Sequence, residues 1–136
     1  MHTPPTMSHR NVEVVREMYE AFANHDREAL VAHLDAEMRV YDRAVHPDAS
    51  VYEGREGFLR FAQTDWDAFD EVRYQPQDFV AHGEYVVVPI KQGGKVKGST
   101  LGVQESIVNV WKLRRGRCVE LRNYSTMGEA MEAIDA

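Results

Sequence analysis

Apolar side chains recur every three or four residues in three stretches of the first half of the chain, a spacing typical of amphipathic helices. The first stretch starts at Asn11 and ends near Asn24, the second follows the favourable N-cap residue Asp26, and the third follows Gly54. Their apolar positions are Val12, Val15, Tyr19 and Phe22 with Val14 and Met18 beside them, then Leu30, Val31 and Leu34, then Phe58, Phe61, Ala62, Trp66 and Phe69. Because the first two helices are joined by a short link, we expect them to pack as a hairpin.

In the second half of the chain the pattern changes to the two-residue alternation of β-strands. Pro76 favours an edge strand or a bulge. Gly93 and Gly94 favour a tight hairpin turn, and the glycine of residues 114–116 favours a three-residue hairpin loop. The expected elements are a short strand over residues 38–42, a loop over 43–53, strands over 72–80, 85–90, 101–113 and 117–125, and a short helix over 129–134.

Helices first and long antiparallel strands afterwards are typical of an α+β fold. A sheet made of long hairpins twists and curves. Helices laid across its concave side would then leave a cone, with a pocket wherever side chains do not fill it. The length of 136 residues suits a single domain, which we expect over residues 11–136. Residues 1–10 are polar and contain two prolines, so we expect a disordered leader there.

The long strand presents two different faces. One carries Ile107, Asn109 and Trp111, with Glu105 as an isolated charge; a mostly apolar hollow with a few polar groups is typical of small-molecule sites. A three-residue loop at 114–116 would place Asn109 opposite Leu121 and Ile107 opposite Asn123. The other face includes Val108 and Val110, which are too apolar to be left in water. We therefore expect this second face to form a dimer contact.

Composition narrows the class of function. The chain has 22 Asp and Glu against 16 Lys and Arg, a net charge of −6, which disfavours nucleic acids and membrane surfaces as partners. No apolar run approaches the roughly 18 residues needed to cross a bilayer, and the first ten residues lack the apolar core of a signal peptide. The single cysteine, Cys118, excludes an internal disulfide, and six scattered histidines predict no metal site. We expect a cytoplasmic protein.

Several segments together resemble the SnoaL-like branch of the nuclear transport factor 2-like superfamily. They are NVEVVREMYEAFANHDREALVAHLD, VYD, VYEGREGFLRF and VWKLRRGRCVELRNY, and they span nearly the whole chain from Asn11 to Ile134. The resemblance implies a cone-shaped α+β barrel with a hydrophobic pocket, usually dimeric through the sheet. The superfamily includes isomerases, cyclases, dehydratases, epoxide hydrolases and noncatalytic binders, so the resemblance alone does not choose among these functions.

The resemblance also suggests roles for individual residues. Asp42 matches the general base of ketosteroid isomerases, whose tyrosine donor falls on Met18, next to Tyr19, and whose second donor falls on Asn109. Asparagine donates a hydrogen bond without needing a shifted pKa. Limonene epoxide hydrolases resemble the chain at Tyr41. Their catalytic aspartate, however, falls on Asn123, and their arginine and aspartate have no counterpart in VVVPIKQ, so we do not expect epoxide hydrolysis. Polyketide cyclases of the SnoaL type use an acid/base aspartate and need no metal or cofactor.

These considerations give two alternative functions. The first is cofactor-independent proton abstraction from a small apolar carbonyl or polyketide-type molecule by a homodimeric isomerase or cyclase; the second is a noncatalytic ligand-binding or dimerisation module. For the first, the candidate catalytic residues are Asp42, His46 and Asn109. The candidate ligand-binding residues are Met18, Tyr19, Tyr41, Phe58, Phe61, Trp66, Ile107, Trp111, Leu121 and Asn123. Each also has a structural interpretation: an aspartate in a turn, an exposed loop histidine, buried asparagines that satisfy the sheet, and aromatic residues of the core.

Overall fold

The computed structural model describes residues 7–42 and 50–135, and His46 lies outside these residues. Its helices are α1 (Met7–Ala23), α2 (Arg27–Ala32), α3 (Gly54–Ala68) and α4 (Met127–Asp135). Its strands are β1 (Leu34–Asp42), β2 (Ser50–Glu53), β3 (Arg73–Pro76), β4 (Val80–His82), β5 (Tyr85–Lys95), β6 (Gly102–Arg114) and β7 (Arg117–Tyr124). The α+β class expected from the sequence is confirmed. No helix in the described part of the chain is long and apolar enough to cross a membrane.

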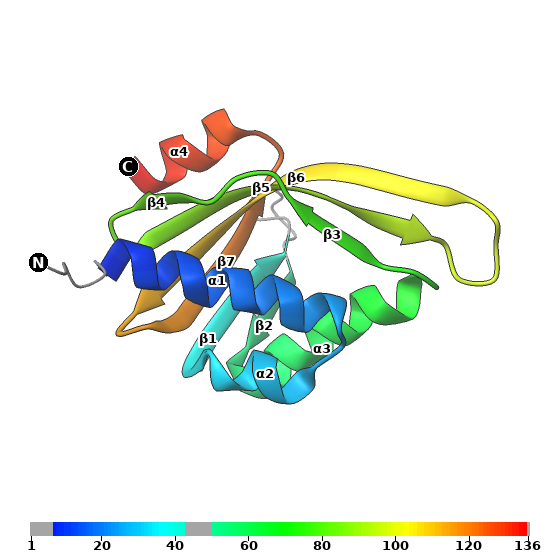
Figure 1. Cartoon of the computed structure of the whole chain (residues 1–136), viewed down its shortest axis with the longest axis horizontal. Helices are drawn as coiled ribbons and strands as arrows, with labels where there is room; N and C mark the ends of the chain where they lie inside the picture. The colour runs from blue at the N-terminus through cyan, green and yellow to red at the C-terminus, as the bar shows by residue number, and fades with distance from the viewer. Residues whose placement is uncertain (1–6, 43–49, 136) are drawn as a thin grey trace, which may run out of the picture.

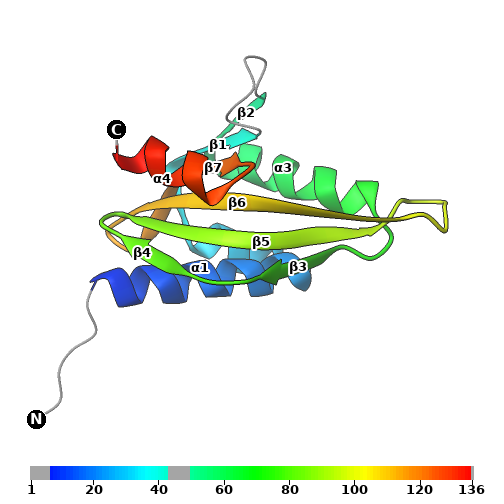
Figure 2. The same ribbon diagram turned by 90° about the horizontal axis from the view of Figure 1, so that it is seen from above.

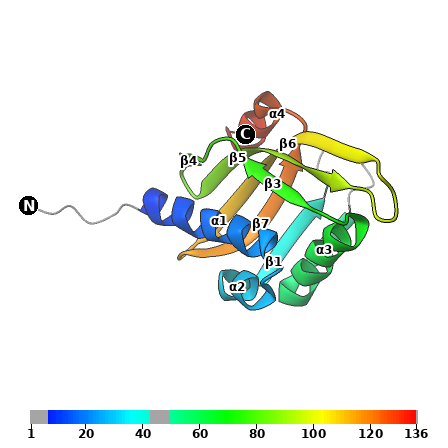
Figure 3. The ribbon, with the colours of Figure 1, turned by 45° about the vertical axis from the view of Figure 1, so that its right-hand side comes forward.

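The strands form one curved sheet that does not close on itself, in the order β2-β1-β7-β6-β5-β3, with β4 also paired to β5. All neighbouring strands are antiparallel except β1 and β7, which are parallel. Figure 1 shows α1, α2 and α3 against one side of the sheet and α4 against the other, and Figure 3 shows that the first side is the concave one. The main core lies between the three helices and this concave face, and its largest fully buried side chains include Trp111, Phe58 and Met18.

The first helices follow the apolar pattern of the sequence, with differences at their ends. Helix α1 begins at Met7, so the expected leader of residues 1–10 overlaps the helix. Asp26 caps α2 as expected, because its carboxylate accepts a hydrogen bond of 3.1 Å from the backbone N–H of Ala29. Leu34 belongs to β1 and not to the second helix. Residues 50–53, expected in a loop, form β2 because they pair with the end of β1.

The hairpin between β5 and β6 differs from the expected one. Gly93 and Gly94 do not form its turn: β5 runs through both of them and pairs them with Gln104 and Val103. The turn lies beyond Lys95, and Gly98 there has a φ of 76°. As a result, the β5–β6 hairpin is the longest feature of the sheet, as Figure 2 shows from above.

The hairpin between β6 and β7 is tighter than expected. Arg114 pairs with Arg117, and the two residues between them both have positive φ, 54° for Arg115 and 76° for Gly116. The strands are therefore joined by two residues and not three, with an irregularity after Lys112. This register places Asn109 opposite Asn123 and Trp111 opposite Leu121, which corrects the expected pairing.

The expected strand over residues 72–80 is divided into β3 and β4. β3 lies at one edge of the sheet and ends at Pro76, as the proline suggested. On the convex face, α4 covers Val108 and Val110, and its buried Ala130 packs against them and Val87. These two valines are therefore shielded from water without a partner chain, and the dimer contact expected on this face stays a prediction.

Candidate functional site

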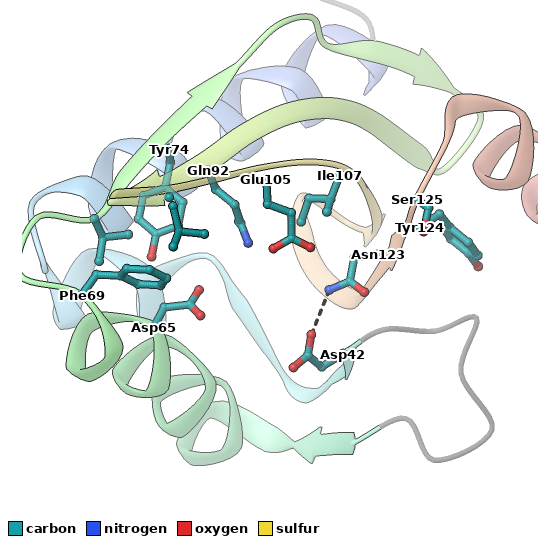
Figure 4. Close-up of a pocket in the computed structure, with 13 residues that line it drawn as sticks. Asp42, Asp65, Phe69, Tyr74, Gln92, Glu105, Ile107, Asn123, Tyr124 and Ser125 are labelled. Atoms are coloured by element: carbon teal, nitrogen blue, oxygen red, sulfur yellow. Dashed lines mark hydrogen bonds between the residues drawn. The ribbon is translucent and has the colours of Figure 1, made fainter. Parts of the chain in front are cut away.

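A cavity of about 200 Å³ opens between α3, β3 and the strands β5, β6 and β7. It is lined by Asp42, Asp65, Phe69, Val72, Tyr74, Gln92, Gly93, Val103, Glu105, Ile107, Asn123, Tyr124 and Ser125. A recess of about 40 Å³ shares six of these residues and adds Tyr19, Phe22, Phe61, Asn109, Trp111 and Leu121. We call these two spaces the outer cavity and the inner recess. Figure 4 shows the outer cavity with its side chains.

Asp42 reaches the cavity because it shares a strand face with the core. Val40 is fully buried on the concave side of β1, and Asp42, two residues later, points the same way. Its Oδ1 accepts a hydrogen bond of 3.1 Å from the side-chain Nδ2 of Asn123, on the neighbouring parallel strand β7 (Figure 4). The carboxylate is therefore held in place at the junction of the outer cavity and the inner recess, both of which it lines.

Asp65 is a second acid in the same cavity, and the sequence analysis missed it. It lies on α3, four residues after Phe61, so it occupies the helix face that carries this aromatic side chain. Phe69, directly after the end of the helix, lines the same cavity. Burial, followed by the negative charge of Asp42, raises the pKa of Asp65 to about 6. A polar residue within an apolar helical stripe was the available signal, since an amphipathic face rarely includes an aspartate without a reason.

Tyr74, also missed, faces Asp65 from β3. Burial and the charge of the neighbouring Asp65 raise the pKa of the Tyr74 hydroxyl. The same contact acts in the opposite direction on Asp65, because the Tyr74 hydroxyl lowers the pKa of that carboxyl group. The hydroxyl oxygen is completely buried, yet among the described residues it has no hydrogen-bond partner in standard geometry. Its neighbour in the sheet, Gln92, also lines the cavity.

A hydrogen-bond network closes the inner recess. The hydroxyl oxygen of Tyr19 accepts bonds from Asn109 Nδ2 at 2.8 Å and from Trp111 Nε1 at 2.9 Å. Burial raises the pKa of this hydroxyl, so it stays protonated. Its two accepted bonds occupy the oxygen lone pairs, which leaves its own hydrogen as the donor. Asn109 therefore reaches the recess as expected, but one of its amide hydrogens is bound to Tyr19.

Most of the candidate residues come together around these spaces. Those that line the outer cavity or the inner recess are Asp42, Asn109, Tyr19, Phe61, Ile107, Trp111, Leu121 and Asn123.

Four candidate ligand-binding residues do not line them. Met18 and Phe58 are fully buried in the core. Trp66 donates from Nε1 to the carbonyl oxygen of Phe22 at 3.2 Å and stacks on His25. Tyr41 points to the opposite side of β1 from Asp42, where Arg122 stacks on its ring at 3.9 Å. The structure thus places these four side chains outside the two spaces.

Among the described residues, the charged side chains that line the outer cavity are all acidic. Asp42, Asp65 and Glu105 come from β1, α3 and β6, and Figure 4 shows their carboxylates directed toward the same space. No lining residue in the described part of the chain is lysine, arginine or histidine. Among the described residues, no group of three His, Cys, Asp or Glu side chains is arranged to hold a metal ion. The arrangement offers carboxylates for acid/base chemistry, with aromatic walls behind them.

Comparison with solved structures identifies the fold. A putative SnoaL-like polyketide cyclase from Jannaschia sp. CCS1 has a TM-score of 0.78 and 20% identity, over 100% of this chain and 99% of the other. An NTF2-like protein from Burkholderia pseudomallei has a TM-score of 0.74 and 24% identity, over 93% and 98%. A protein with a ketosteroid isomerase-like fold from Catenulispora acidiphila, solved in complex with trimethylamine, has a TM-score of 0.73 and 17% identity, over 85% and 86%.

A search of curated proteins found no match. The family model for the SnoaL-like domain, in contrast, matches residues 15–121. This range includes β1 with Asp42, the whole of α3 and the first five residues of β7. This match covers most of the chain and agrees with the folds of the structural neighbours. The chain therefore belongs to the SnoaL-like domain family.

Proposed function

We propose that the cavity binds a small carbonyl compound and that Asp42 removes a proton from the carbon next to the carbonyl group. The observation that carries the proposal is the position of the Asp42 carboxylate, which lines both spaces and is held by Asn123. A positioned carboxylate beside apolar walls is a suitable base for this reaction. The names of two structural neighbours, a putative polyketide cyclase and a protein complexed with trimethylamine, support small-molecule binding.

The reaction would begin when Asp42 accepts the proton and the electrons of the broken C–H bond move into an enolate. The negative charge then develops on the carbonyl oxygen, where the hydrogen of the Tyr19 hydroxyl or the remaining amide hydrogen of Asn109 stabilises it. Return of the proton from Asp42 to another carbon gives an isomer. Attack of the enolate on a second carbonyl group of the same molecule, followed by protonation of the new alkoxide, gives a ring.

The test uses a minimal substrate, cyclohex-3-en-1-one, whose conversion to the conjugated cyclohex-2-en-1-one is followed by ultraviolet absorbance. We expect the wild-type protein to accelerate the conversion and Asp42→Asn to lose a factor of about 10² or more, as is typical when a general base is removed. Glu37→Gln removes an exposed carboxylate of the same strand and should leave the rate unchanged. Equal rates for Asp42→Asn and the wild type would refute the role of Asp42.

The second candidate function is a noncatalytic binding module. It is favoured by one observation, namely that Tyr19, Asn109 and Trp111 already satisfy one another and so have a structural role without any ligand. In this case small ketones would bind without conversion, and Asp42→Asn would leave their affinity nearly unaltered. Binding measured by NMR beside the rate measurement separates the two functions.

A further inference from the structure

Among the described residues, the three carboxylates of the outer cavity have no positive partner. The ion pairs found among the described residues involve Glu13, Glu17, Glu53, Glu71, Glu120 and Asp135, and none involves Asp42, Asp65 or Glu105. Most acidic side chains in those pairs lie at the exposed surface, where a charge stays solvated and costs little free energy. Asp42 and Asp65 are half-buried, where an uncompensated negative charge is costly.

The walls between these carboxylates are aromatic. Phe69 lies beside Asp65, and the ring of Tyr74 lines the same cavity (Figure 4). Aromatic faces attract cations, and most strongly where water is partly excluded. The buried Tyr74 hydroxyl, which interacts with Asp65, adds another oxygen on this side. Carboxylates, a hydroxyl oxygen and aromatic rings around one space are the groups that bind an organic ammonium ion.

We propose that the ligand of the outer cavity carries a positively charged amine or quaternary ammonium group, which lies among Asp42, Asp65 and Glu105. This inference rests on the proposed function, because it names the class of the small molecule that the cavity binds. The inner recess, whose apolar lining includes Phe61, Trp111 and Leu121, is left for an uncharged part of that molecule. A substrate of the proposed reaction is then a carbonyl compound that also bears an amine, and anionic compounds are excluded by charge repulsion.

The positions of the carboxylates agree with a charged group in the outer cavity and the remainder of the ligand in the inner recess. Glu105 is exposed at the rim, where it attracts a cation from solvent, and Asp65 lies further in beneath the aromatic side chains. The three carboxylates repel one another, since the negative charges of Asp42 and Glu105 both oppose ionisation of Asp65. A bound cation relieves this repulsion and so is stabilised by all three groups. The volume of about 200 Å³ suits a small amine.

The test compares choline with 3,3-dimethylbutan-1-ol, which has the same shape but a carbon atom in place of the charged nitrogen. Binding of each to the full chain is measured by NMR titration. We expect choline to bind at least about tenfold more tightly, and Asp65→Asn and Glu105→Gln each to weaken choline several-fold while leaving the neutral compound unchanged. Glu132→Gln, an exposed carboxylate on α4 across the sheet, is the charge-matched control and should change neither affinity.

Equal binding of the two compounds, tighter binding of the neutral one, or no binding of choline at millimolar concentration would overturn the inference. Loss of choline affinity in Glu132→Gln equal to that in Asp65→Asn would also overturn it, because the effect would then be one of net charge. These outcomes do not affect the role of Asp42 as a base, which is tested separately with the neutral cyclohexenone. The two proposals can therefore fail independently.

Discussion

At the scale of single residues, the cavity is defined by acids that differ in their surroundings. Asp42 is held by the amide of Asn123, whereas Asp65 lies against aromatic side chains and faces Tyr74. Burial and the charge of Asp42 raise the pKa of Asp65 to about 6. A carboxyl group with a pKa raised in this way is able to donate a proton near neutral pH, a role distinct from the one we propose for Asp42.

The raised pKa of Asp65 makes stability depend on pH. Its folded-state pKa lies above the unfolded value, so ionisation of Asp65 opposes folding. The resulting loss of stability is absent below about pH 4, grows as the pH rises, and is complete above about pH 6. We expect Asp65→Asn to equal the wild type in its free energy of unfolding at pH 4 and to exceed it by roughly 2–3 kcal/mol at pH 7.5. Urea unfolding at both pH values measures this difference.

The control for this prediction lies on the same helix. Asp67 is exposed and accepts a hydrogen bond of 2.8 Å from the side chain of Gln63, so Asp67→Asn should show no gain that grows with pH. If Asp65→Asn proved no more stable than the wild type at pH 7.5, Asp65 would not be an acid with a raised pKa, and its place among uncompensated carboxylates would be wrong.

At the scale of elements, the width of the cavity is set where the end of α3 meets the end of β5. The backbone N–H of Asp70 donates to Lys95 O at 2.9 Å and that of Lys97 to Ala68 O at 3.1 Å. Gly94 allows this approach, because a Cβ there would lie 1.9 Å from the carbonyl oxygen of Glu71. The close approach fixes Phe69, and with it one wall of the cavity, against β5.

We therefore expect Gly94→Ala to lower the free energy of unfolding by roughly 2–4 kcal/mol, since neither backbone can move aside without breaking these bonds. Gly102→Ala is the matched control: its φ is not positive, and a Cβ would find nothing within 4 Å. It should change stability by no more than about 0.5 kcal/mol. Chemical denaturation of the two variants measures both effects, and equal stabilities would show that the close approach does not exist.

The same glycines show where sequence reasoning succeeded and failed. Periodicity predicted the existence and order of the helices and the long strands, because it reports which face each element buries. It could not locate the turns of the two hairpins. Gly93 and Gly94 have the composition of a turn, but they are explained by tertiary contacts, Gly93 by its close approach to Val103 and Gly94 by its close approach to Glu71. A similar tertiary contact, pairing with β1, turned residues 50–53 into a strand.

For the candidate site, sequence reasoning identified the strand residues better than the helical ones. Alternation on β6 and β7 placed Ile107, Asn109 and Asn123 on the concave face correctly, even though the assumed register was shifted. On α3, in contrast, the sequence pattern could not distinguish the apolar side chains that belong to the core from those that line the cavity. Only the structure separates Phe61, which lines the recess, from Phe58 and Trp66, which do not. Asp65 was missed because the stripe was defined by its apolar members.

At the scale of the whole molecule, the sheet separates two apolar regions. The concave side holds the core and the cavity, and the convex side is covered by α4 over Val87, Val108 and Val110. A homodimer through the sheet stays a prediction, and its contact would have to avoid these valines. The role of α4 is to make the convex face of one chain stable in water.

Two alanines of α4 test this role. Ala130 is fully buried against the sheet, whereas Ala133 on the same helix is exposed. We expect Ala130→Asp to cost roughly 2–4 kcal/mol, because it buries an unpaired charge or displaces the helix, and to promote self-association by exposing the valines. Ala133→Asp should change neither property. Urea unfolding and sedimentation measure both, and identical behaviour of the two variants would show that α4 does not cover the sheet.

The central claim is that the cavity beside Asp42 and Asn123 binds a small molecule, and the chain carries its own reporters for a direct test. The indole N–H of Trp111 lies in the network around the inner recess, whereas Trp66 does not line the recess and its indole N–H is bonded to the carbonyl oxygen of Phe22. We would titrate the ¹⁵N-labelled protein with cyclohex-2-en-1-one and follow these signals together with the side-chain amides of Asn109 and Asn123. We expect saturable shifts at Trp111, Asn109 and Asn123 and none at Trp66. Unchanged cavity signals, or equal shifts at both tryptophans, would contradict the central claim.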